Sequence, residues 1–211
     1  NWKINDWARF YAEGIYAEVG EEAAYIPRFI DRNYGDFLNL FFDLKLTDNL
    51  TFRIGRQELL YGSQRLVSPL DWANTRRTFK GAKLYWQGKD LDVDAFWTRP
   101  MQIDVTRFDS PNYDQEFGGL YSTYRGFKNV AADFYYLRLV NTASDFNFDT
   151  LGTRVAGKHC CWLYELEAAF QFGDYQSVNH SAGAFTAGGV GRWPRGGGWP
   201  GSAAVVEPGA G

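Results

Sequence analysis

Apolar and polar residues alternate along one segment after another of this chain. In the clearest segment, residues 37–46, one face carries Leu38, Leu40, Phe42, Leu44 and Leu46, and the other carries Asn39, Asp43 and Lys45 with Phe41. A period of two places successive side chains on opposite faces of a β-strand. The pattern predicts ten strands, at about residues 8–16, 37–46, 50–57, 82–86, 91–98, 117–124, 130–136, 151–155, 162–172 and 181–187.

Composition narrows the choice of fold class. Phe, Trp and Tyr make up 18% of the 211 residues, which argues against disorder, and the formal net charge of -3 argues against a nucleic-acid partner. Mean hydropathy is -0.39 and no apolar run approaches about 18 residues, which excludes a transmembrane helix. The two cysteines, Cys160 and Cys161, are adjacent and cannot form a disulfide framework. A soluble β-sandwich and a transmembrane β-barrel remain.

The connections between the predicted strands favour the barrel. Short turns are expected at 47–49, 87–90, 125–128 and 158–161, alternating with longer connections at 19–36, 60–78, 99–115, 140–148 and 173–179. Outer-membrane barrels have short turns at the periplasmic rim and long external loops at the other, whereas a Greek-key sandwich need not alternate. Aromatic residues near strand ends on the apolar faces suit the two membrane interfaces; they are Tyr16, Trp86, Trp97, Trp162 and Tyr164. The predicted fold is an all-β, antiparallel, up-and-down transmembrane barrel.

The last 24 residues depart from this pattern. Between Gly188 and Gly211 there are nine Gly and three Pro, and the alternation is lost. Proline cannot donate a hydrogen bond to a β-ladder. The sequence therefore predicts a partial barrel over residues 1–187 and an irregular extension over 188–211, which a shift of the reading frame would also explain.

Residues 55–79 read GRQELLYGSQRLVSPLDWANTRRTF. This segment resembles the signature of the alginate-export family of outer-membrane β-barrels, in which a strand ending G-R-Q-E-L leads into a loop of the form Y-G-x-Q-R-L-x-x-P-x-D-W-x-N, followed by T-F. Segments 80–84, 151–154 and 162–167 are similar to further family strands, although Lys80 stands where an acidic residue is common. The resemblance covers about residues 7–187 and implies an eighteen-stranded barrel, of which these strands form the N-terminal half.

The same resemblance implies a function. Family barrels pass an anionic polysaccharide through an arginine-lined lumen, in the outer membrane of Gram-negative bacteria. Because members of the family are diverse, the implied substrate is an acidic polysaccharide or a small anionic solute. The implied partners are outer-membrane lipid and a periplasmic export protein. The positions carried over by motif match are Arg56, Arg65 and Asp71, with Arg76 and Arg77 in the same loop.

The polar faces of the predicted strands supply further candidates for the lumen. The cations are Arg9, Lys45, Arg53, Lys83 and Arg154, and the anions include Glu165 and Glu167 beside Glu13, Asp43, Asp92, Asp94 and Asp133. Arginine can hold a uronate carboxylate through two parallel hydrogen bonds. The excess of anions weakens a purely anion-selective interpretation, and the charges could instead pair across neighbouring strands. Straight alternation from Leu50 would direct the Arg56 side chain outwards. Arg56 is therefore expected either above the lipid band or beyond a bulge at Gly55.

The connection at 60–78 is long enough to be either functional or disordered. It combines Trp72 with Arg65, Arg76 and Arg77, a mixture that suits stacking on sugar rings and binding of carboxylates. We expect this loop to fold into the mouth of the pore. The alternative is an external loop with scattered charges.

Residues for catalysis are scarce. The two histidines, His159 and His180, stand in a turn and a polar loop, and no G-x-S-x-G motif occurs. The carboxylate pairs Asp92/Asp94 and Glu165/Glu167 are more simply lumen charges than glycosidase acids. His159 with the two cysteines cannot complete a tetrahedral metal site without further partners. No enzyme, cofactor or metal site is predicted, and a secreted carbohydrate-binding β-sandwich and an outer-membrane enzyme are the alternatives to a channel.

Overall fold

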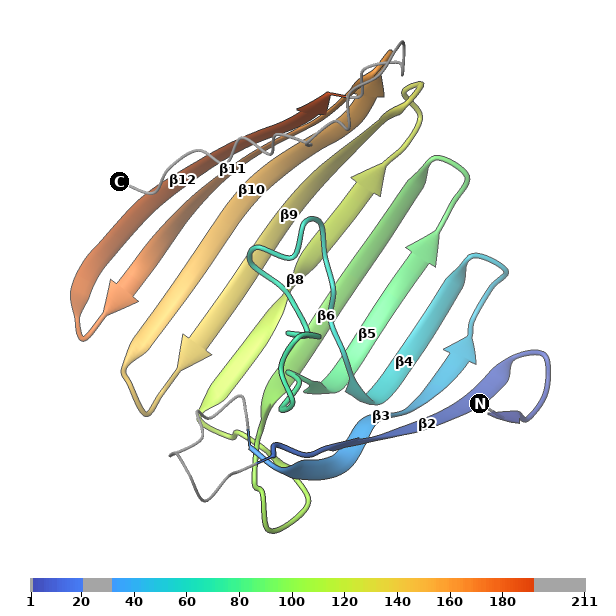
Figure 1. Cartoon of the computed structure of the whole chain (residues 1–211), viewed down its shortest axis with the longest axis vertical. Helices are drawn as coiled ribbons and strands as arrows, with labels where there is room; N and C mark the ends of the chain where they lie inside the picture. The colour runs from blue at the N-terminus through green and yellow to red at the C-terminus, as the bar shows by residue number, and fades with distance from the viewer. Residues whose placement is uncertain (1, 21–31, 192–211) are drawn as a thin grey trace.

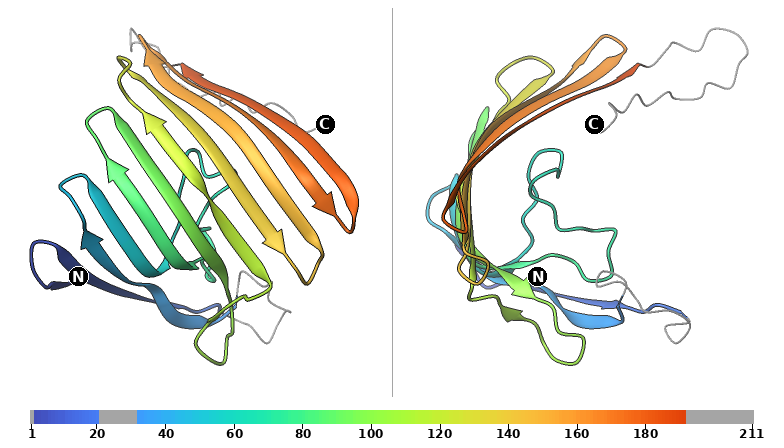
Figure 2. Two further views of the ribbon diagram at one scale, coloured as in Figure 1. Left: turned by 180° about the vertical axis from the view of Figure 1, so that it is seen from behind. Right: turned by 90° about the vertical axis from the view of Figure 1, so that its left-hand side faces the viewer.

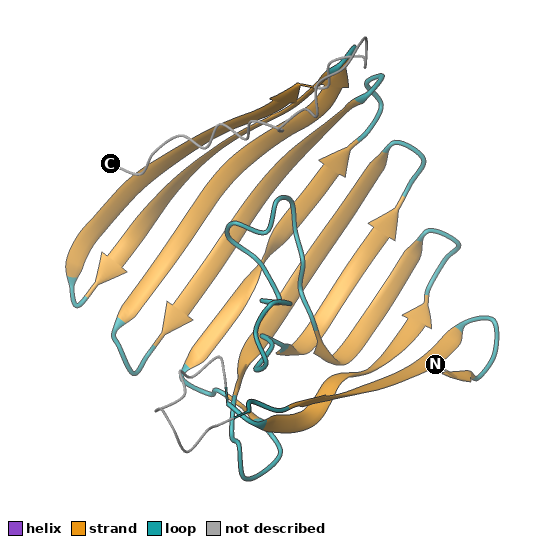
Figure 3. Cartoon of the chain, in the orientation of Figure 1, coloured by secondary structure: helices purple, strands orange, loops and turns teal. Residues whose placement is uncertain are grey.

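The computed structural model describes residues 2–20 and 32–191, which form one antiparallel sheet with the strands in sequence order (Figure 1). All the regular elements are strands (Figure 3), and all ten predicted strands are present. The ten are β2 (Ala8–Ala17), β3 (Tyr34–Lys45), β4 (Leu50–Gln57), β5 (Phe79–Gln87), β6 (Leu91–Gln102), β8 (Gln115–Tyr124), β9 (Val130–Asn141), β10 (Phe146–His159), β11 (Trp162–Tyr175) and β12 (Val178–Gly191). Two short strands, β1 (Trp2–Lys3) and β7 (Ser110–Pro111), pair with β2 and β6.

The sheet is strongly curved, and one connection lies across its concave side (Figure 2). In the described residues β2 and β12 stand near opposite ends of the strand order and do not pair. Within residues 2–20 and 32–191 no second sheet packs on this one, so the alternative of a β-sandwich is wrong. The same residues contain no helix with the length and apolar character needed to cross a membrane.

Alternation sorts the side chains onto the two faces of the sheet. One row of register partners runs through Leu84, Ala95, Leu120, Tyr136, Leu151 and Phe170. Its large members are exposed or half-exposed on the convex face. The concave face carries Asp43, Lys83, Asp94 and Asp133, and we call it the inner face. This division is the one predicted from the sequence.

Leu38 is an exception to that prediction. It was expected on the apolar face beside Leu40, but it is buried, whereas Phe37 is 41% exposed. The pairing of β2 with β3 shifts register between Glu13 and Gly14, so that Leu38 is an extra residue without a partner. Such a bulge reverses the alternation on one side of it, and the sequence pattern alone did not reveal it.

The predicted alternation of short and long connections is only partly correct. The short turns are 46–49, 88–90, 125–129 and 160–161, and three long connections occur at 18–33, 58–78 and 103–114. The two remaining connections, expected to be long, are tight turns at 142–145 and 176–177. Asp145, Gln176 and Ser177 adopt positive φ, which closes these two tight hairpins. The ends of β9 to β12 therefore include polar residues that the sequence pattern assigns to loops. The predicted tail begins inside β12, and residues 192–211 lie outside the described part.

Candidate functional site: the inner face and the inner loop

Residues 58–78, which we call the inner loop, connect β4 to β5 and lie across the inner face (Figure 2). Gly62, Gln64 and Leu70 have positive φ, and these left-handed residues turn the chain back on itself. Tyr61 N donates to Val67 O at 3.3 Å, which closes the first half of the loop. A Cβ at residue 62 would lie 2.7 Å from the Tyr121 hydroxyl, so glycine permits the close approach to the sheet.

An aromatic side chain anchors the inner loop to the sheet. Tyr61 stacks between Phe96 and Tyr121, with ring centroids 5.5 and 4.5 Å away, and its hydroxyl donates to Asp94 at 2.8 Å. Burial and the Asp94 carboxylate raise the pKa of Tyr61, so the hydroxyl stays protonated and keeps donating. Leu59 and Val67 from the same loop join Phe96 and Tyr121 in the buried apolar cluster. The inner loop thus supplies part of the hydrophobic core.

An arginine holds the inner loop to a distant strand. Arg65 Nη1 donates to Glu165 and to Glu167, the latter at 2.8 Å, both on β11. Glu167 also accepts hydrogen bonds from Ser63 Oγ and from the Tyr135 hydroxyl, each at 3.0 Å. The hydrogen bonds that Arg65 donates to the two carboxylates raise the pKa of its guanidinium. The loop folds onto the inner face (Figure 2), as expected of an inward fold, and the alternative of an external loop is wrong. Its place in the mouth of a pore remains a prediction.

Charged side chains on the first strands of the inner face are paired. Asp43 on β3 accepts from Arg53 Nε at 2.7 Å and from Arg9 Nε at 3.1 Å, so one carboxylate serves two cations. The Arg53 guanidinium also lies 3.6 Å from the centroid of the Phe41 ring. On the next strands, Lys83 Nζ donates to Asp94 at 3.0 Å. At Asp43 the two arginines exceed the carboxylate by one, whereas Glu13 on the same face of β2, which accepts from Tyr11 and Asn39, balances the charges of this group.

A second charged group lies on β9 to β11. Asp133, which is 2% exposed, accepts from the Tyr121 hydroxyl and from Arg154 Nη1, each at 2.9 Å. Arg154 Nη2 donates to Glu165 at 2.6 Å, which connects this group to Arg65. A buried carboxylate requires such partners, because an unpaired charge is costly to desolvate. The carboxylates exceed the cations by one here, and the cross-strand pairing considered from the sequence is what the structure contains.

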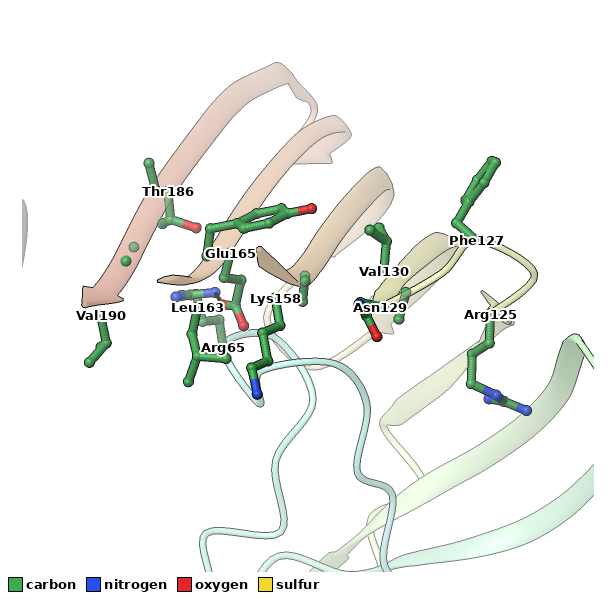
Figure 4. A pocket seen from close by; sticks show the side chains of 17 residues that line it. Arg65, Arg125, Phe127, Asn129, Val130, Lys158, Leu163, Glu165, Thr186 and Val190 are labelled. Atoms are coloured by element: carbon green, nitrogen blue, oxygen red, sulfur yellow. Dashed lines mark hydrogen bonds and ion pairs between the residues drawn. The ribbon is translucent and has the colours of Figure 1, made fainter. Parts of the chain in front are cut away.

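A hollow of about 970 Å³ lies beside Arg65 on the inner face (Figure 4). Arg65 and Glu165 border it together with Lys158, near the end of β10, and Arg125, in the short turn 125–129. Small residues, among them Ala131 and Ala156, line the wall between these charges. The hollow leaves open space along the inner face from the Arg65 contact towards the short-turn rim.

Arg56 occupies a separate, buried position at the rim of the long connections. It is 7% exposed, pairs with Asp36 at 2.6 Å and Asp109 at 2.8 Å, and donates to the Tyr34 hydroxyl at 3.1 Å. Gly55 before it has a φ of 136°, and a Cβ there would lie 2.3 Å from Leu40 O. The pairing of β4 continues through Gly55 without a register shift, so the bulge considered there is absent. Arg56 joins connection 103–114 to the sheet.

The family comparison decides the assignment. A family model described as Alginate export matches residues 5–210. The chain belongs to the alginate-export family. The match is wider than the motif resemblance over residues 7–187, and it includes most of the glycine-rich tail. No curated protein sequence matches the chain.

A solved structure supports the fold of this alginate-export family chain. The chain is similar to the crystal structure of the outer-membrane porin OccK8 (OprE) of Pseudomonas aeruginosa, with a TM-score of 0.50 and 12% sequence identity. The similarity covers 88% of this chain and 55% of the porin, so the chain spans about half the length of OccK8. At this identity the likeness shows the fold alone: an antiparallel up-and-down sheet that matches part of a porin barrel. Porin and export families are generally non-enzymatic transport proteins.

The structure brings some of the predicted site residues together and separates others. Arg9, Arg53, Lys83, Arg65, Arg154, Glu165 and Glu167 meet in the two charged groups of the inner face. Lys45 instead pairs with Asp48 in a turn at 3.0 Å, and Arg76 lies 3.3 Å from Glu58. Asp71 and Arg77 are exposed on the inner loop, as is Trp72. Their part in binding a solute remains a prediction.

Sequence reasoning missed several residues that complete the site. Tyr121 and Tyr135 stack at 5.5 Å and donate to Asp133 and Glu167. Their positions on the polar faces of two neighbouring strands were a usable signal, because a Tyr among charged residues is suited to donating a hydrogen bond. Asp36 and Asp109 carried no such signal. Among the described residues no group of three His, Cys, Asp or Glu could hold a metal ion.

We expect Tyr61→Phe to loosen the inner loop. The variant keeps the stacking but loses the hydrogen bond to the Asp94 carboxylate. This loss should lower the free energy of loop opening by about 1–2 kcal/mol. Opening of the loop should increase roughly five- to thirtyfold, measured as the rate of tryptic cleavage at its arginines. Tyr16→Phe is the control, because Tyr16 is 77% exposed on β2. Equal cleavage rates in both variants would contradict the anchoring role of the hydroxyl.

Proposed function

We propose that this alginate-export family chain forms part of the wall of an outer-membrane channel in a Gram-negative bacterium. An acidic polysaccharide or a small anionic solute would pass passively along the inner face, beside the inner loop. The observation that carries the proposal is the combination of a charged inner face, crossed by a fixed loop, with an apolar convex face. Lipid would contact the convex face, and a periplasmic export partner would meet the short-turn rim.

The distribution of charge on the convex face supports a lipid contact. Arg99, two residues after the exposed Trp97, pairs with Glu116, and Arg138, two residues after Tyr136, pairs with Asp149 at 2.8 Å. Both pairs stand towards the strand ends at the rim that carries the long connections, the second of them next to the tight turn 142–145. A charge facing lipid at mid-depth costs about 2–4 kcal/mol, much less near the interface. Paired charges towards this rim, with apolar residues below them, suit a lipid boundary.

The two charged groups of the inner face support passage of a charged solute. At Asp43 two arginines, Arg9 and Arg53, share one carboxylate, so one cation is in excess there. The group on β9 to β11, with Arg65, has one carboxylate in excess. The excess cation is shared by Arg9 and Arg53, and it is the charge that would attract an anion. The hollow beside Arg65 would continue the path towards the short turns.

Arg9→Gln tests this assignment without leaving a carboxylate unpaired, because Arg53 still pairs with Asp43. Its permeability ratio in planar bilayers is expected to move towards cations by roughly two- to fivefold, since one charge a few ångströms from an ion contributes about 1 kcal/mol in water. The shift should shrink at high salt. Lys45→Gln, which removes the same charge at an exposed turn, should leave selectivity unchanged. Equal selectivity of the wild type and Arg9→Gln would remove Arg9 from the solute path.

Extraction provides an independent test of the membrane location. The protein is expected to stay in the cell envelope until detergent is added. Lipid-facing tryptophans, Trp86, Trp97 and Trp162, should be quenched by brominated lipid. Release from the envelope without detergent, or unquenched tryptophan fluorescence, would contradict the proposed function.

A further inference from the structure

We propose that Cys160 and Cys161 are a redox-active dithiol site that closes to a disulfide between adjacent residues when it meets a disulfide oxidant. The two residues are the whole connection between β10 and β11, and their Sγ atoms lie 3.3 Å apart. Cys160 is exposed, and its φ of 52° places it at the tip of the hairpin. These are the two cysteines of the chain.

Closure follows thiol–disulfide exchange in two steps. The Cys160 thiolate attacks one sulfur of the oxidant's disulfide, and the other sulfur leaves as a thiolate. The Cys161 thiolate then attacks the Cys160 sulfur of the mixed disulfide and releases the second half of the oxidant. The two cysteines together lose two protons and two electrons, and the oxidant disulfide is reduced to two thiols.

The environment of the two thiols sets their order of reaction. Cys160 is exposed, whereas Cys161 is half-buried. The hydrogen bond with Cys160 raises the pKa of the Cys161 thiol, which lowers its thiolate fraction. Cys160 therefore attacks the oxidant, and Cys161 resolves the mixed disulfide from a position already in contact with the Cys160 sulfur.

Adjacency makes the disulfide easily reversed. Neighbouring Cα atoms across a trans peptide lie about 3.8 Å apart, whereas ordinary disulfides join Cα atoms about 4.4–6.8 Å apart. The eight-membered ring is therefore strained, and strained or exposed disulfides exchange readily with thiols. The site would take and return electron pairs rather than serve as a permanent cross-link.

The partner is a thiol–disulfide exchange protein of an oxidising compartment. This part of the inference rests on the proposed function, because short turns of outer-membrane barrels face the periplasm, where disulfides form and persist. The hairpin tip leaves Cys160 accessible to such a partner.

The experiment uses the reduced, folded protein in a glutathione redox buffer. After an acid quench and alkylation, trypsin should release residues 159–192, which hold both cysteines between Lys158 and Arg192. We expect this peptide to be lighter by two hydrogens, with neither glutathione nor the alkylating group attached. An excess of reduced glutathione should restore two alkylatable thiols. Cys161→Ser should trap glutathione on Cys160, and Cys160→Ser should react more slowly.

Several results would overturn the proposal: two free thiols at every redox ratio, stable glutathione on both cysteines, or a disulfide between two copies of the chain. The same peptide from isolated cell envelopes separates this proposal from the proposed function. A disulfide that forms in the buffer but is absent from the cell would leave the dithiol chemistry intact and contradict the periplasmic orientation of the turn.

Discussion

Replacing Arg65 with glutamate is expected to detach the inner loop from β11 and to raise the conductance of the proposed channel. In the wild type one guanidinium contacts Glu165 and Glu167 together. The substitution brings three carboxylates together, so attraction becomes repulsion. Arg65 is 40% exposed, and water screens part of this change, so we expect a loss of about 1–2 kcal/mol in loop attachment. The open population of the loop should then increase roughly five- to thirtyfold.

Conductance and proteolysis report this release independently. Single-channel recordings should show larger and more variable currents, because the loop no longer holds a fixed place across the inner face. Trypsin should cleave faster at Arg76 and Arg77, which remain in the loop. Arg77→Glu is the matched control for conductance: it makes the same change of charge at an exposed position of the same loop. If Arg65→Glu gives the same currents as Arg77→Glu and is cleaved at Arg76 and Arg77 at the wild-type rate, the contact with β11 does not fix the loop.

The strands could be predicted well because the alternation of apolar and polar residues in each strand depends on that strand alone. Alternation within a strand reflects which side chains face water, and it located all ten long strands. It failed at Leu38, where a bulge depends on the pairing of two strands rather than on either one. It also failed at 142–145 and 176–177, where polar residues belong to strand ends and positive φ values close the turns.

The candidate site was harder to predict, because its contacts join distant segments. The family motif singled out Arg65, but its partners Glu165 and Glu167 lie a hundred residues further along the chain. Alternation placed those glutamates on the polar face without indicating what they contact. Register alone aligns Arg154 with Asp133, and this part of the site could be derived once the strand order was assumed. The fold of the inner loop itself, with Tyr61 inserted between two rings, could not be derived in this way.

Arg56 is the position where a substitution should cost most stability. Its partners Asp36 and Asp109 have side chains that are only 1% exposed. Arg56→Met keeps most of the side-chain volume and leaves two buried carboxylates without their cation. Breaking a buried ion pair by removing one partner costs about 3–5 kcal/mol. For a chain of this size that corresponds to a fall in Tm of roughly ten degrees, measured by thermal unfolding in detergent.

The pH dependence of this loss distinguishes a charge effect from a packing effect. Burial raises the pKa of Asp109 in connection 103–114 even in the wild type. A carboxyl whose folded pKa is raised contributes stability that is present at acid pH and lost as the pH rises through that pKa. Without Arg56 this rise in pKa should be larger, so Arg56→Met should recover part of its stability on acidification. A packing defect would cost the same at every pH.

Two further variants make the assignment of Arg56 falsifiable. Arg56→Lys keeps the positive charge but loses the planar fork that reaches both carboxylates and Thr78 at 2.9 Å, so its stability should lie between wild type and Arg56→Met. Lys45→Met removes a cation whose partner Asp48 is fully in water, and we expect no measurable change. Arg56→Met should also expose connection 103–114 to tryptic cleavage at Arg107, because Asp109 would no longer be held against the sheet. If Arg56→Met unfolds at the temperature of Lys45→Met and leaves Arg107 protected, the ion pairs do not hold this connection.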